Sequence, residues 1–144
     1  MCDADETAKT VYDIIETPNA SPPGGHYVQG VAWGGLITVS GQLPVGTPTG
    51  QGTNAEFEAQ ARAALLSFLE IVKAGGGDKA SVLNVRAYIV GVEYWPIFNR
   101  VYSEIFGQYR PARAVVPVPE LHLGYYIEIE GTAVTVGHHN ANKV

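Results

Sequence analysis

RPARAVVPV at residues 110–118 and YIEIEGTAV at residues 126–134 are the two stretches that decide the fold. In the second stretch Ile127 and Ile129 alternate with Glu128 and Glu130, which predicts a strand with one apolar face and one acidic face. Two carboxylates at this spacing lie roughly 7 Å apart, too far to share a proton but close enough to serve one pocket. Arg113, in the first stretch, is the expected counter-charge.

Two helices are predicted upstream of these stretches. The first begins at Thr53, where Glu56 three residues later completes a capping box, and it ends at the glycines of 75–77. The second begins near Tyr94 and ends at Gly107. In both segments apolar residues recur at the spacing of a helix that buries one face.

Short strands are predicted at 10–16, 26–33, 36–42 and 82–90, with a hairpin turn at Gly34-Gly35. Since strand-helix-strand connections favour parallel neighbours and one handedness, both helices should cover the same face of a mixed sheet. The sequence therefore predicts an α+β fold in a single domain at 10–137, between a flexible leader at 1–9 and a flexible tail at 138–144.

The composition limits the classes of protein and of partner. The 144 residues are 46% hydrophobic, enough for one core, and the net charge of -5 with scattered Lys and Arg disfavours nucleic acid as a partner. Cys2 is the only cysteine, so an intrachain disulfide is excluded and a reducing compartment is indicated. No stretch resembles a signal peptide or a membrane span, and we expect a cytoplasmic protein.

The alternation of side chains assigns residues to the two faces of the predicted sheet. The helix-covered face should carry Ile37, Val39, Leu83, Val85, Ala87, Ala114, Val116, Val118, Ile127 and Ile129. The opposite face should carry Thr38, Ser40, Asn84, Arg86, Tyr88, Arg113, Val115, Pro117, Glu128 and Glu130. This second face mixes apolar residues with charges, as a subunit interface with polar pockets does, and it predicts a homo-oligomer.

Five motifs, in order along the chain, carry a resemblance to a known family. They are HYVQGV at 26–31, VSGQLP at 39–44, FNRVY at 98–102, PAR at 111–113 and IEIE at 127–130. Together they resemble the Rid family of reactive-intermediate deaminases, also called the YjgF family. The resemblance implies a fold similar to Bacillus chorismate mutase, a homotrimer with three sites between subunits, and a last strand inserted between two earlier ones.

The resemblance also implies a chemistry, the hydrolysis of enamines and imines such as 2-aminoacrylate to 2-oxo acids and ammonia without a metal or organic cofactor. Arg113 would hold the substrate carboxylate, which a planar fork of donors binds bidentately. Glu128 would position and activate the attacking water. The resemblance carries over four further substrate-binding positions, Tyr27, Ser40, Gly41 and Asn99.

One position departs from the family pattern, and several residues keep a structural alternative. Val115 stands where many members have cysteine, which leaves the substrate open. Arg113 could form a structural ion pair, and either Glu128 or Glu130 should pair with Arg86 across adjacent strands. Tyr27 and Asn99 could serve packing alone, and Ser40 could satisfy the backbone. The adjacent histidines at 138–139 lack carboxylate neighbours and do not indicate a metal site.

Three functions follow from the sequence: an imine or enamine hydrolase, a non-catalytic binder of small carboxylates, and a ribonuclease or translation inhibitor. The acidic chain without a basic stripe disfavours the third. The residues do not separate the first two, but turnover of a freshly generated imine, compared with retention of a 2-oxo acid, would.

Overall fold

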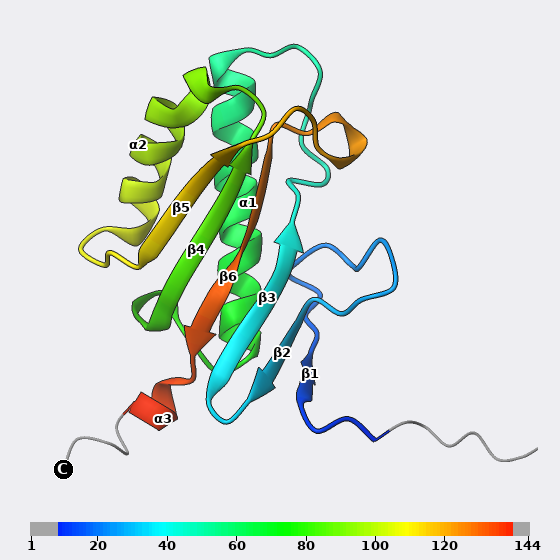
Figure 1. The fold of residues 1–144 in the computed structure, drawn as a ribbon, viewed down its shortest axis with the longest axis vertical. Helices are drawn as coiled ribbons and strands as arrows, with labels where there is room; N and C mark the ends of the chain where they lie inside the picture. Colours follow the sequence, from blue (N-terminus) through cyan, green and yellow to red (C-terminus); the bar gives the residue numbers. More distant parts are fainter. Residues whose placement is uncertain (1–8, 140–144) are drawn as a thin grey trace, which may run out of the picture.

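Six strands form one mixed sheet in the order β1-β2-β3-β6-β4-β5 (Figure 1). The structure, a computed structural model, describes residues 9–139. The strands are β1 (Asp13–Ile15), β2 (Gly30–Trp33), β3 (Leu36–Gln42), β4 (Val82–Ile89), β5 (Ala112–Pro117) and β6 (Ile127–Val134). The helices are α1 (Asn54–Ala74), α2 (Trp95–Phe106) and the single turn α3 (Val136–His139), with 3-10 turns η1 (Lys79–Ser81), η2 (Val92–Tyr94) and η3 (His122–Gly124).

The last strand, β6, lies in the middle of the sheet and runs antiparallel to both β3 and β4. Among the strands of residues 9–139, only the β4–β5 pair is parallel, as expected for strands joined through α2. Gly131 allows this central position, because a Cβ there would collide with the Asn84 carbonyl and press against the Phe68 ring of α1. The predicted α+β architecture, including the inserted last strand, is confirmed.

Helix α1 begins where the sequence predicts. The Thr53 hydroxyl accepts a hydrogen bond from the Glu56 N–H at 3.2 Å. The Glu56 carboxylate, however, accepts hydrogen bonds from the N–H groups of Gln51 and Gly52 at 3.0 and 2.8 Å and so stabilises the loop before the helix. The expected capping box is therefore only half formed.

Both long helices cover one face of the sheet, and the core lies between the two layers (Figure 1). The polar Gln60 is fully buried within it and is satisfied on both sides. Its Nε2 donates to the Pro48 carbonyl at 3.0 Å, and its Oε1 accepts from the Tyr126 N–H at 2.9 Å. The largest fully buried apolar side chains are Phe57, Phe68, Phe98, Phe106, Ile37, Leu65, Ile71, Ile89, Ile127, Ile129 and Val72.

The predicted side-chain faces of the sheet are right for β3 and β6 and wrong for all of β5. Val85, which faces the core, lies beside Arg113 in the parallel β4–β5 pair, so Arg113, Val115 and Pro117 are on the helix-covered side. Ala114 and Val116 are on the open side. Strand β5 is an edge strand with small or apolar residues at most positions, and such a pattern does not fix which face is buried.

Leu83 of β4 is also misassigned, because it is 46% exposed while Val82 is buried. The register between β4 and β6 shifts between Val82 and Asn84, and this irregularity reverses the alternation at the start of the strand.

The expected leader at 1–9 and tail at 138–144 lie largely outside the described residues, as does Cys2. None of the helices among residues 9–139 combines the length and the hydropathy that a membrane-spanning helix requires.

Candidate functional site

A cavity of about 460 Å³ lies beside Glu128 at the end of β3. Its walls come from the loop that precedes β2, the end of β3, the turn η3 and the open face of β6. Of the sequence-predicted site residues, the structure brings together Tyr27, Gly41 and Glu128 here.

The Glu128 carboxylate points toward Gly41, where a Cβ would collide with it. The absent side chain of Gly41 therefore makes the room that the carboxylate occupies. The Glu128 side chain accepts no hydrogen bond from another residue of 9–139, and burial, followed by the charge of Glu130, raises its pKa. A carboxylate with a raised pKa is a stronger base, which suits the activation of water.

Glu130, two residues along the same face, is in a different environment. It accepts hydrogen bonds from the Tyr88 hydroxyl at 2.5 Å and from the Arg86 Nε at 3.1 Å. These two contacts, the tyrosine first, lower the pKa of Glu130. The expectation that one of the two acids pairs with Arg86 is confirmed, and the acid that remains unpaired in the cavity is Glu128.

Tyr27 and Ser40 lie close in space but differ in their contacts. The Tyr27 hydroxyl accepts from the Gly24 N–H at 3.1 Å, and the side chain, about half exposed, lines the cavity. The Ser40 hydroxyl donates to the Val28 carbonyl at 2.6 Å and does not line the cavity. The Ser40 hydroxyl therefore holds the loop that carries Tyr27 against β3. This is the structural role, satisfying the backbone, that the sequence left open for Ser40.

Arg113 lies at a second place, over α2. Its guanidinium stacks on the ring of Tyr102, 4.8 Å from the centroid, and donates to the Asn99 Oδ1 at 3.1 Å. No carboxylate among residues 9–139 lies within ion-pair distance of it. The Arg113 guanidinium is thus held by the Asn99 amide and the Tyr102 ring and has no acidic partner among these residues. Its planar set of N–H donors is suited to binding the carboxylate of a ligand.

The structure corrects the expectation that Arg113 is the counter-charge of the acidic face. Arg113 lies beside Val85 on the helix-covered side, whereas Glu128 lies beside Tyr88 on the open side. Within one chain the predicted residues thus form two groups, Tyr27 with Gly41 and Glu128, and Asn99 with Arg113. A site that uses both groups needs two copies of the chain.

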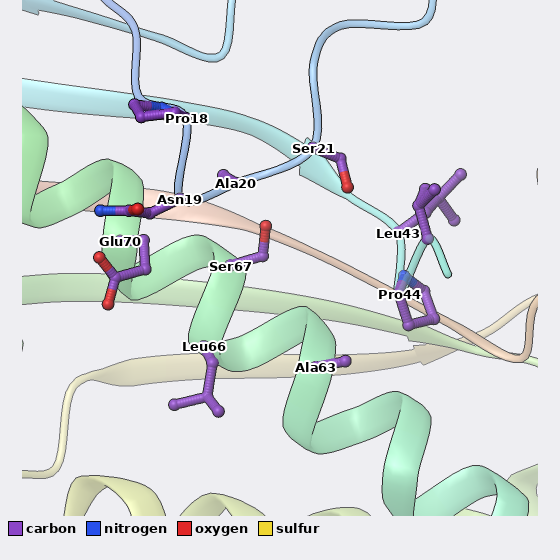
Figure 2. A pocket seen from close by; sticks show the side chains of 11 residues that line it. Pro18, Asn19, Ala20, Ser21, Leu43, Pro44, Ala63, Leu66, Ser67 and Glu70 are labelled. Atoms are coloured by element: carbon purple, nitrogen blue, oxygen red, sulfur yellow. The ribbon is translucent and has the colours of Figure 1, made fainter. Parts of the chain in front are cut away.

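A neighbouring cavity of about 350 Å³ lies between α1 and the loops at 18–21 and 43–45 (Figure 2). None of the predicted site residues lines it. Its Ser67 hydroxyl donates to the Oε1 of Gln42 at 2.9 Å, and Gln42 lines the Glu128 cavity. Its one acidic side chain, Glu70, pairs with Lys73 at 3.3 Å.

Sequence reasoning missed His122, which lines the Glu128 cavity from the turn η3. The available signal was a histidine in the connection that leads into the strand of Glu128. No residue pattern distinguished it, because the turn has neither helical nor strand periodicity.

The comparisons with known proteins agree with this fold. Residues 17–135 match the family model described as endoribonuclease L-PSP. The 2-iminobutanoate/2-iminopropanoate deaminase of Escherichia coli K12 is 36% identical over 123 residues, which cover 83% of this chain and 95% of that protein. A RutC family protein of Pyrococcus horikoshii is 33% identical over 84% of this chain and 96% of its own length. The crystal structure of E. coli TdcF with bound serine has a TM-score of 0.77 at 31% identity, covering 85% of this chain and 98% of that one.

Proposed function

The chain belongs to the endoribonuclease L-PSP family, the Rid or YjgF family of the resemblance above, and from this membership we propose that it hydrolyses reactive 2-imino acids and their enamines. The products are a 2-oxo acid and ammonia. The observation that carries the proposal is the contrast between two neighbouring acids. Glu130 is engaged by hydrogen bonds from Arg86 and Tyr88, while Glu128 remains unpaired, with a raised pKa, in a cavity.

Glu128 takes the role of general base in this mechanism. Its carboxylate removes a proton from a water molecule in the cavity as the water oxygen adds to the carbon of the imine. Gly41 keeps space open beside that carboxylate, and Tyr27 borders the bound substrate. Arg113 holds the substrate carboxylate so that the imine carbon faces the water, with Asn99 orienting the guanidinium.

Arg113 and Glu128 lie on opposite faces of the sheet, so a site that uses both residues requires more than one chain. We infer that each site forms between two copies of the chain, with Arg113 from one and Glu128 from the other. The family resemblance specifies a homotrimer. The open face of the sheet supports an interface, since it exposes large apolar side chains, among them Ile14, Trp33, Leu36 and Val116.

The first prediction concerns this assembly. Light scattering at micromolar concentration should give about three times the 15.4 kDa mass of one chain. Val116→Asp should shift the protein toward monomers, because an unpaired charge in an interface costs about 2 to 5 kcal/mol. The matched control is Leu66→Asp, since Leu66 is also exposed but lies on α1.

A single species with the mass of one chain in the wild-type protein would contradict the assembly. Equal dissociation by Val116→Asp and Leu66→Asp would show that the open face of the sheet is not the interface.

The function itself is tested by turnover. An enzyme that releases 2-aminoacrylate is coupled to the appearance of pyruvate, and the wild-type chain should raise the rate above the spontaneous one. Binding of a 2-oxo acid without any added turnover, for every short-chain enamine tried, would favour the non-catalytic binder.

A further inference from the structure

The turn η3 lies in the connection between β5 and β6 at residues 118–126 (Figure 1). It forms one wall of the Glu128 cavity. His122 and Leu123 of this turn line the cavity together with Glu128. Three titratable side chains line it among the described residues, Tyr27, His122 and Glu128. The function proposed above leaves His122 without a role.

The backbone that follows His122 in this turn is held in an uncommon conformation. Leu123 has φ 61°, the single positive φ of a non-glycine residue within 9–139, and Gly124 follows with φ 74°. A leucine adopts this conformation at a steric cost and keeps it only where the surroundings hold it. Here the Thr49 hydroxyl donates to the Gly124 carbonyl at 2.7 Å, and the Gly46 N–H donates to the hydroxyl of buried Tyr125 at 3.3 Å.

Imine hydrolysis needs an acid as well as a base. Water loses a proton to the base, while the nitrogen must gain protons before it can leave as ammonia. Glu130 is held by Tyr88 and Arg86, and the Tyr27 hydroxyl, a weaker acid than an imidazolium, accepts a backbone hydrogen bond. Histidine is the side chain that exchanges a proton near neutral pH.

We propose that His122 is a catalytic residue of this cavity and delivers a proton to the substrate nitrogen; the inference rests on the proposed deaminase function. Glu128 takes a proton from water as the water oxygen bonds to C2 of the 2-imino acid. The π electrons of the C=N bond move to nitrogen, which takes a proton from the His122 imidazolium, and a carbinolamine forms.

The second step returns both side chains to their starting states. The protonated Glu128 carboxyl gives its proton to the amino nitrogen, and neutral His122 removes the proton of the hydroxyl group. The C–N bond breaks, and ammonia and the 2-oxo acid leave.

The electrostatics of the cavity are consistent with this pairing. Burial and the charge of Glu130 raise the pKa of Glu128, while His122 opposes that rise, so the imidazole lies within electrostatic reach of the carboxylate. Glu128, Glu130 and Tyr27 are therefore the groups that a pH profile must consider. Of these, Glu130 should stay charged throughout because Tyr88 and Arg86 lower its pKa.

The test compares His122→Gln with His26→Gln. His26 is also an exposed histidine of a loop near the cavity, but it does not line it. With 2-aminoacrylate released in situ, His122→Gln should lower kcat at least tenfold and leave KM within about twofold. His26→Gln should match the wild type.

Two further readouts separate proton transfer from a structural role. The wild-type kcat should fall as the pH rises from about 6 to 8, and this fall should be absent from the His122→Gln profile. Imidazole added to His122→Ala should restore part of the lost kcat.

Several results would overturn the proposal. Wild-type kcat in His122→Gln would remove the role of His122 and leave the deaminase function intact. A rise in KM alone would assign His122 to substrate binding, and failure of imidazole to restore activity would assign it to structure. Absence of turnover in the wild type and in His26→Gln would overturn the deaminase function as well.

Discussion

Glu128→Gln should lower the turnover of 2-aminoacrylate by about 10²-fold or more, because it removes the base that activates water. The amide has nearly the shape of the carboxylate and preserves the cavity beside Gly41. Binding of a 2-oxo acid should therefore persist. The measurements are pyruvate formation above the spontaneous rate and titration of the variant with pyruvate.

The matched control is Glu130→Gln, the same change two residues away on the same strand. Glu130 is engaged by Arg86 and Tyr88, so its loss should disturb a structural contact and leave turnover near that of the wild type. If Glu130→Gln is inactive and Glu128→Gln is active, the assignment of the two acids is wrong, although the fold is unaffected.

Arg113→Ala should lose both 2-oxo acid binding and turnover. A charge-assisted bidentate contact and its orienting effect contribute roughly 2 to 4 kcal/mol, so the deficit in kcat/KM should be about 30-fold to 10³-fold. Arg113→Lys should recover little, because a lysine keeps the charge but not the planar fork that stacks on Tyr102 and meets Asn99.

The control for this change is Arg110→Ala, an exposed arginine three residues earlier that lies outside the cavity. It should bind 2-oxo acids as the wild type does. Unchanged pyruvate binding by a folded Arg113→Ala protein would contradict the role of Arg113 as the group that holds the carboxylate.

The residue pattern was sufficient for the helices and for most strands, because their apolar spacing is regular. It did not place β6 between β3 and β4; the family resemblance did. A strand position in a sheet depends on contacts between distant residues such as Gly131 and Phe68, which local periodicity does not encode.

The residue pattern also assigned the side chains of β5 to the wrong faces of the sheet. This error affects the predicted site. With Arg113 on the helix-covered side, the two predicted catalytic residues of one chain do not meet. In IEIE the two faces of the strand are clearly indicated, because charged and aliphatic residues alternate there. In RPARAVVPV small and aliphatic residues occupy both faces, so only the pairing of Arg113 with Val85 decides the orientation.

Three of the five motifs, HYVQGV, VSGQLP and IEIE, contribute residues to the same cavity. This brings Tyr27, Gly41 and Glu128 together. Tyr27 and Gly41 line it as expected, and their functional role stays a prediction. Ser40 makes a backbone contact instead, and His122 was overlooked. The surroundings of Ser40 and of His122 depend on the path of a loop or turn. Single hydrogen bonds, such as that between Thr49 and Gly124, set such a path.

The central claim, that each site takes Arg113 from one copy and Glu128 from another, is tested most directly by mixing two inactive variants. Arg113→Ala and Glu128→Gln chains are coexpressed in equal amounts and purified as mixed oligomers. If the site is shared, random assembly restores both residues in about a quarter of the sites, and the mixture should regain about that fraction of wild-type turnover. Activity no higher than the average of the two separate variants would contradict the claim.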